Sequence, residues 1–161
     1  MAQFDVPDDH KRSFWQNERI MKTEVGAQGF TKADPKMSDW VVMGAFAMFS
    51  KRWTKVRGTL YLTNNRLIFI RDLGKDEKIP KTPAERIKHR KDRELFHYFE
   101  GIKEVKVHKS RLGKSSLRVI YTPKRSTETF PVDWFVKDPE EWCKDVKDAL
   151  KVYGKKHKKR T

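Results

Sequence analysis

Hydrophobic and polar residues alternate most regularly along the segment Gly58–Ile70. Leu60 and Leu62 fall on one face of a strand, and the return segment Leu67–Ile70 is rich in β-branched and aromatic residues. Between the two runs stands Asn64–Asn65, and asparagine tolerates the positive φ that tight turns require. The pattern therefore predicts a β-hairpin.

The same two-residue period predicts further strands on both sides of this hairpin. The segment Glu18–Phe30 fits a strand that ends in a turn at Gly26 and Gly29. After the hairpin, strands are expected at Val105–Val107, Leu117–Tyr121 and Thr127–Trp134. The most apolar run, Trp40–Phe49, fits either a buried strand or a short helix, and periodicity does not decide between them.

Two segments carry helix signals. Thr82–Glu85 reads as a capping box, and we expect a mostly solvated helix from there to about Phe96. The second helix should begin after Asp138, an N-cap residue followed by proline, and stop at Gly154. Its apolar residues recur at helical spacing and form one stripe: Trp142, Val146, Ala149, Leu150 and Tyr153.

This order of elements indicates an α+β fold of the PH-like type. We expect a bent antiparallel β-barrel of about seven strands, closed by one C-terminal amphipathic helix that buries its stripe over an open end. The expected organisation is a flexible N-terminal segment over residues 1–17, a domain over 18–154 with insertions near 32–53 and 75–99, and a basic tail or linker over 155–161.

Charge narrows the classes of partner. The chain has 37 lysines and arginines against 22 acidic residues, a formal net charge of +15. Such a field favours polyanionic partners, namely nucleic acid, anionic membrane or acidic protein surfaces. No recognised nucleic-acid motif is present and the bases are spread along the chain, so nucleic acid is the less favoured of these partners.

Several classes of site and location are disfavoured by composition. Cys143 is the only cysteine, which excludes an intrachain disulfide and a cysteine-based zinc site and suits a reducing compartment. The segment Met1–His10 does not read as a signal peptide, and no apolar run reaches the ~18 residues of a membrane span. We expect a cytoplasmic protein that associates peripherally with membranes.

Enzyme and metal motifs do not occur in the sequence. It has no glycine-rich phosphate loop, no Gly-x-Ser-x-Gly and no His-Glu-x-x-His. None of the five histidines pairs at a metal-like spacing with another histidine or with the cysteine, and we read Cys143 as a packing residue. We therefore expect no catalysis, no metal and no cofactor.

The hairpin carries a family resemblance. Gly58–Ile70 reads Gly-Thr-Leu-Tyr-Leu-Thr-Asn-Asn-Arg-Leu-Ile-Phe-Ile and resembles the GRAM-domain signature Gly-x-Leu-x-Leu-Thr-Asn-x-Arg-Leu-Ile-Phe. The resemblance covers roughly Glu18–Gly154 and is weakest between Lys75 and Phe99. It implies a PH-like domain of the GRAM superfamily.

Within that superfamily the chain is most similar to the GLUE domain, the ubiquitin-binding module of the ESCRT-II complex. Glu24–Gly29 is similar to its Val-Gly-Leu-x-Asp-Gly turn, with Gln28 in place of the acidic residue, and Gly113–Val119 is similar to its Ser-Ser-Lys-Ile strand. The link between the first two strands is longer here, over Lys36–Trp53.

This resemblance implies a non-enzymatic adaptor in ESCRT-type protein transport or sorting. Its partners would be ubiquitin or a ubiquitin-like protein, an anionic lipid membrane surface, and other ESCRT-type subunits. One alternative is a generic GRAM-like domain that binds anionic lipid without ubiquitin. The other alternative is a basic protein that binds nucleic acid.

Candidate lipid-binding bases precede and open the hairpin. PH-type lipid binders often place a lysine and then a basic-x-basic pair here, and Lys55-Val-Arg57 fits that spacing. Alternate residues of a strand point the same way, so Lys55 and Arg57 can converge on one phosphate. The alternative is a solvated basic face. The full candidate set is Lys51, Arg52, Lys55, Arg57, Lys109, Arg111 and Lys114.

Bases also occur in two later loops, which a PH-like barrel could bring near one rim. One loop holds Lys109, Arg111 and Lys114, and the other holds Lys124 and Arg125. They would add to an anionic site there, or remain scattered and solvated.

Apolar residues supply two further candidate surfaces. Beside the first bases lie Trp40, Phe46, Met48 and Phe49, which fit a membrane-inserting loop or burial, with burial favoured. By similarity to GLUE domains, a ubiquitin-binding patch would come from the late strands and the last helix. Its candidates, which could equally close the core under that helix, are Phe130, Trp134, Phe135 and Val136.

Overall fold

The computed structural model describes residues 6–32, 53–109, 113–122, 127 and 129–158. The predicted segment Trp40–Phe49 lies outside these residues, as does most of the expected insertion near 32–53. The helices are α1 (Asp8–Lys11), α3 (Pro83–Arg93), the 3-10 helix η1 (Phe99–Gly101) and α4 (Pro139–Lys158). The strands are β1 (Ile20–Lys32), β2 (Trp53–Thr63), β3 (Arg66–Arg71), β4 (Glu94–Tyr98), β5 (Ile102–Lys109), β6 (Ser115–Tyr121) and β7 (Phe130–Phe135).

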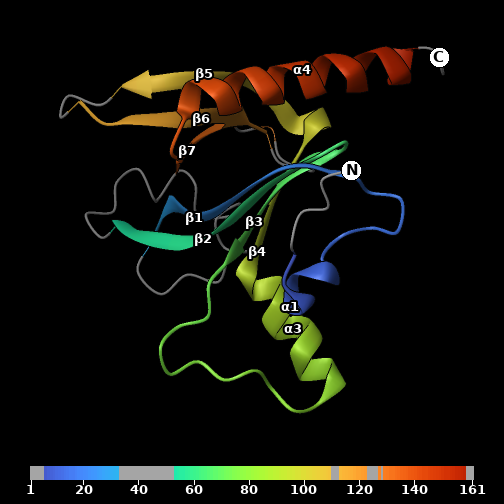
Figure 1. Cartoon of the computed structure of the whole chain (residues 1–161), viewed down its shortest axis with the longest axis vertical. Helices are drawn as coiled ribbons and strands as arrows, with labels where there is room; N and C mark the ends of the chain where they lie inside the picture. The colour runs from blue at the N-terminus through green and yellow to red at the C-terminus, as the bar shows by residue number, and fades with distance from the viewer. Residues whose placement is uncertain (1–5, 33–52, 110–112, 123–126, 128, 159–161) are drawn as a thin grey trace.

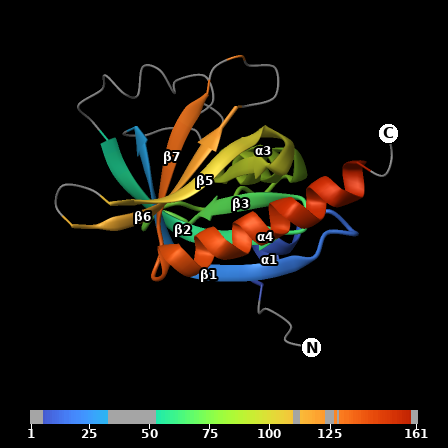
Figure 2. The same cartoon turned by 90° about the horizontal axis from the view of Figure 1, so that it is seen from above.

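The seven strands form one bent antiparallel sheet in the order β4-β3-β2-β1-β7-β6-β5 (Figure 1). β1 joins its two halves, because it pairs with β2 along its whole length and with β7 only at Gln28 and Gly29. α4 packs across β5 and β6 (Figure 2). The predicted PH-like α+β fold is confirmed, but the described residues show β4 and β5 as unpaired edges, so the sheet is not a closed barrel.

β1 does not end in the predicted glycine turn. It continues to Lys32, and Gly26, whose φ is +83°, forms a bulge between Val25 and Ala27 where the register with β2 shifts. A bulge inserts one extra residue and bends the strand. This bend lets β1 leave one half of the sheet and reach the other.

The first predicted helix is present but shorter than expected. Thr82 caps it, since its Oγ1 accepts the Glu85 N–H at 3.4 Å. The helix ends at Arg93 rather than near Phe96, because residues 94–98 pair with β3 as β4. The expected insertion near 75–99 therefore contains a strand that belongs to the sheet.

The C-terminal helix α4 begins as the sequence predicts. Asp138 Oδ1 accepts the Glu141 N–H at 3.0 Å. Cys143 is buried and its Sγ donates to the Val105 carbonyl at 3.6 Å, which agrees with a packing role. The helix passes through Gly154 to Lys158, because one glycine costs only about 1 kcal/mol in a helix and the residues after it are good helix formers.

Both faces of β2 and β3 are covered. On one face, residues such as Leu60, Phe69 and Trp142 form the main core between the sheet and α4. On the other face, Val6, Phe14, Ile20 and Phe96 pack on a second core of Tyr61, Ile68 and Ile70. Residues 6–17, expected to be flexible, thus form α1 and turns that lie on the sheet, because the outer face of β2 and β3 is itself apolar.

None of the helices in the described residues is long and apolar enough to cross a bilayer.

Candidate functional site: a basic surface around helix α3

The predicted lipid-binding bases that the structure describes are not brought together. Arg57 is exposed on β2, and Lys55 stands two positions earlier on the same strand. Lys109 and Lys114 are exposed at the β5–β6 hairpin, which β6, β7 and β1 separate from β2. Strands lie about 4.8 Å apart, so these lysines are remote from Arg57. Lys51, Arg52 and Arg111 lie outside the described residues, as do Lys124 and Arg125.

The two later loops do not share a rim, which was one of the two alternatives left open for their bases. The β5–β6 hairpin precedes Ser115, at the start of β6, whereas the β6–β7 connection follows Tyr121, at its end. Antiparallel pairing places these two connections at opposite ends of the sheet.

The predicted ubiquitin-binding residues do not form an exposed patch either. Trp134 is fully buried, with its ring 4.6 Å from that of Phe69 and its Nε1 donating to His97 Nε2 at 3.3 Å. Its indole therefore packs in the main core, which was the alternative interpretation of this residue. Phe135 is half-buried beside Gln28, Val136 packs against the main core, and the side chain of Phe130 is not among those described.

A different surface combines exposed apolar and basic side chains. It consists of the connection 72–82 and helix α3, and we call it the α3 surface. Its exposed apolar residues are Leu73, Ile79 and Ile87, which are 37%, 50% and 46% exposed. Among the side chains of this segment that the structure describes, six exposed bases outnumber three exposed acids, Asp72, Asp76 and Glu85; the bases are Lys75, Lys78, Lys81, Arg86, Lys88 and Lys91.

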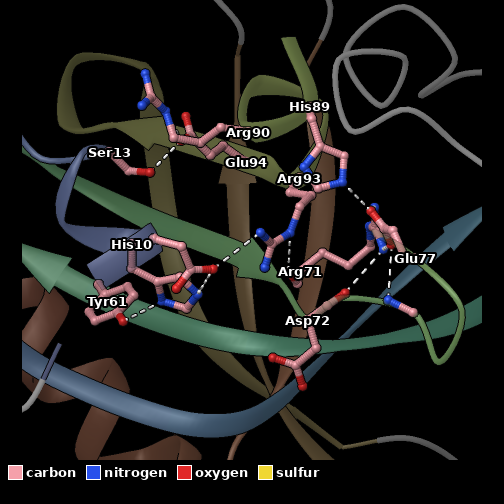
Figure 3. Close-up of polar contacts among 12 residues, drawn as sticks. His10, Ser13, Tyr61, Arg71, Asp72, Glu77, His89, Arg90, Arg93 and Glu94 are labelled. Atoms are coloured by element: carbon pink, nitrogen blue, oxygen red, sulfur yellow. Dashed lines mark hydrogen bonds and ion pairs between the residues drawn. The ribbon is translucent and has the colours of Figure 1, made fainter. Parts of the chain in front are cut away.

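Glu77 fixes the connection to the sheet and to α3 (Figure 3). Its carboxylate accepts two hydrogen bonds from Arg71, at 2.8 and 3.0 Å, and one from the Gly74 N–H at 2.9 Å. It also lies 2.6 Å from His89 Nε2 of α3. The hydrogen bonds from Arg71 are the main reason that the pKa of Glu77 is lowered to about 2.

A second contact fixes the connection against helix α3. Arg86 Nε donates to the Pro80 carbonyl at 2.8 Å, which folds the connection back onto the first turns of α3. Ile79 precedes Pro80 and Ile87 follows Arg86, so both isoleucines adjoin this hydrogen bond. Both isoleucines are exposed, so the connection and the helix each carry an exposed apolar side chain next to this contact.

The other side of α3 is held by Arg93 and Glu94, where the helix meets β4. Arg93 is buried, its Nε donates to the Arg71 carbonyl at 2.9 Å, and its Nη1 lies 3.3 Å from Asp9 Oδ2 (Figure 3). Glu94 accepts a hydrogen bond from Ser13, and burial raises the pKa of its carboxyl. These contacts hold α3 against the sheet and the N-terminal segment, so the exposed face of α3 is a preformed surface.

Sequence reasoning missed the α3 surface. It described the segment as a charged, solvated insertion, which is correct for most of its residues. The available signal was the presence of Ile79 and Ile87 as isolated apolar residues in a highly charged run. The exposure of Ile87 depends on which side of α3 makes the polar contacts of His89 and Arg93.

The described residues contain no group of three or more histidine, cysteine or acidic side chains that could hold a metal ion. Comparison with known proteins finds no matching family model and no matching curated protein. The chain is similar in structure to the hSac2 domain from human phosphoinositide phosphatase Sac2, with a TM-score of 0.46 and 11% identity over 91% of this chain and 77% of that one.

Proposed function

We propose that the chain is a non-enzymatic PH-like binding domain that docks on anionic membranes through the α3 surface. The observation that carries this proposal is the exposure of Ile79 and Ile87 among six exposed bases. Apolar side chains rimmed by bases suit the interface of an anionic bilayer, because the apolar groups enter the acyl boundary while the bases meet the headgroups.

The free energies expected for these contacts favour reversible membrane binding. Burying a half-exposed isoleucine is worth about 1 kcal/mol, and each base near an anionic surface adds about 1 kcal/mol. Two isoleucines and several bases thus supply a few kcal/mol after the cost of association. Arg57 on β2 would add to the attraction, because the Asp72 N–H donates to the Arg57 carbonyl at 3.0 Å and so the connection begins beside β2.

Ubiquitin binding has less support. It relied on four late residues, of which Trp134 is buried and Val136 packs on the core. Recognition of ubiquitin and of ESCRT-type subunits therefore remains a prediction from the family resemblance alone.

Sedimentation with vesicles tests the membrane proposal. The chain should sediment with vesicles of phosphatidylcholine and phosphatidylserine and not with phosphatidylcholine alone. Replacing Ile79 and Ile87 by serine should weaken binding roughly 10- to 30-fold, since both apolar contributions are lost. Lys88→Glu with Lys91→Glu should weaken it by at least about tenfold through loss of attraction and added repulsion.

The matched control is Lys144→Glu with Lys147→Glu on α4. These lysines are equally exposed and also helical, but they lie on the other side of the sheet from α3 (Figure 1). Their reversal makes the same change in net charge and should have a much smaller effect. An equal loss of vesicle binding in both double variants would contradict a binding surface localised at α3. Loss of binding on charge reversal without any effect of the isoleucines would mean that the chain binds the vesicle surface through charge alone.

A further inference from the structure

The first half of β1 has an open edge. β1 pairs with β2 from Ile20 to Lys32, but on its other side it pairs with β7 only at Gln28 and Gly29. Within the described part of the chain, residues 20–27 have no strand on that side. An unpaired edge is a template on which an extended peptide can add a strand.

A groove lies between this open edge and the first turns of α4. It has a volume of about 720 Å³, and residues 21–24 of β1 form one wall. The side chains of Leu62 and Trp142 line its apolar part. This volume is within the range of about 300–1,000 Å³ typical of binding sites for small ligands, which several side chains of an extended peptide can fill.

The groove is preformed, because Glu24 ties β1 to the start of α4. One carboxylate oxygen of Glu24 accepts from Trp142 Nε1 at 2.9 Å, and the other accepts from the Lys137 N–H at 2.8 Å. A partner would therefore not have to order these walls when it binds.

The charge of the groove is opposite to that of the chain. Five carboxylates and two lysines line it, although the chain carries a net charge of +15. The contacts of one of these lysines, Lys22, show that the groove accommodates a side-chain ammonium group. Its Nζ lies 2.9 Å from both Glu141 and Asp145 and 5.3 Å from the centre of the Trp142 ring. Exposed Asp148, one turn of α4 beyond Asp145, extends the acidic wall.

We propose that the open edge of β1 and this groove bind an extended, lysine- or arginine-rich segment of another protein, which adds to β1 as a strand. Backbone hydrogen bonds to the edge would hold the segment, and its basic side chains would meet the carboxylates of α4. The basic residues 155–158 at the end of α4 are not the occupant, because they are helical and a helix cannot add to a sheet edge.

Helix α4, whose first turns line the groove, lies on the opposite side of the sheet from α3 (Figure 1). A domain that docks on a membrane through α3 would therefore leave the groove open to a partner. The inference does not depend on membrane binding, and the two can fail separately.

The test uses the full chain, labelled for NMR, and a peptide of about eight alternating lysine and valine residues, which matches the length of the open edge. Binding should shift the amide signals of residues 21–25 and slow their hydrogen exchange. A peptide of the same sequence with N-methylated backbone amides keeps the charge but cannot form strand hydrogen bonds. It should bind at least about tenfold more weakly.

Two variants locate the site. Glu141→Lys with Asp148→Lys should weaken the unmodified peptide by at least about tenfold. The matched control is Glu140→Lys with Glu104→Lys, which changes the net charge by the same amount. Both carboxylates are exposed and neither lines the groove, so the affinity for the peptide should stay within about twofold.

Three results would overturn the proposal. One is the absence of shifts along β1, and another is equal binding of the methylated and unmodified peptides. The third is sedimentation showing that the chain self-associates through β1, because a second copy would then occupy the edge.

Discussion

Replacing Glu18 by alanine should destabilise the fold by about 3 kcal/mol, because it removes the counter-ion of a buried arginine. Arg66 is only 1% exposed. Its Nε and Nη2 each donate to the Glu18 carboxylate at 2.8 Å, and the Glu18 side chain is itself fully buried. Arg66 lies in the hairpin that carries the family resemblance, so this pair explains in physical terms what one residue of that motif does.

The size of the effect follows from what remains after the substitution. Breaking a buried ion pair by removing one partner costs about 3–5 kcal/mol. In Glu18→Ala, Arg66 keeps the Ser13 carbonyl at 2.7 Å and stays between the rings of Trp15 and Phe96, at 4.2 and 4.4 Å. These contacts compensate part of the charge, so we expect the lower end of the range.

Urea unfolding followed by tryptophan fluorescence measures this free energy. In a double-mutant cycle, Glu18→Ala in an Arg66→Met background should cost much less than in the wild type, because no charge is then left unpaired. The control is Asp8→Ala, which breaks an exposed ion pair with Lys11 and should cost no more than about 0.5 kcal/mol. A cost below about 1 kcal/mol for Glu18→Ala, or equal costs in both backgrounds, would refute the reasoning.

Three further substitutions test the packing, the core histidine and the helix cap. Gly29→Ala would place a Cβ 2.5 Å from the Trp134 ring, and thermal melting should show a loss of about 1–3 kcal/mol. Burial lowers the pKa of His97 from 6.5 to about 3, so its contribution to stability is complete above pH 6.5 and is lost as the pH falls toward 3. The stability difference between wild type and His97→Leu should therefore shift against the wild type by about 1.4 kcal/mol per pH unit in this window, and a constant difference in urea titrations would contradict it. Thr82→Ala should cost about 1 kcal/mol in the same titrations, with exposed Thr127→Ala as a control of near-zero cost.

Local signals in the sequence determined most of the fold. The hairpin, the cap at Thr82 and the start of α4 at Asp138 are each encoded within a few residues, through alternation or through a side chain that caps its own backbone. β4 was not predicted, because it has only five residues and follows α3 without a loop, so no local signal separates it from the helix. Its pairing with β3 is a tertiary interaction.

Side-chain exposure was decided by the tertiary structure. The sequence could not show that Trp134 lies inside the core, or that the polar segment before Glu18 packs on the outer face of the sheet through Tyr61 and Arg66. Nor could it show that the candidate lipid-binding lysines at β2 and at the β5–β6 hairpin lie on distant strands.

The two surfaces proposed to bind partners are tertiary features for the same reason. Ile87 is exposed because His89 and Arg93 hold the opposite side of α3, and Ile79 is exposed on the connection that precedes the helix. The acidic groove exists because β7 leaves β1 after two residue pairs and α4 begins beside the open edge. Composition and periodicity determine which elements form, but which of their faces remain free depends on how those elements pack together.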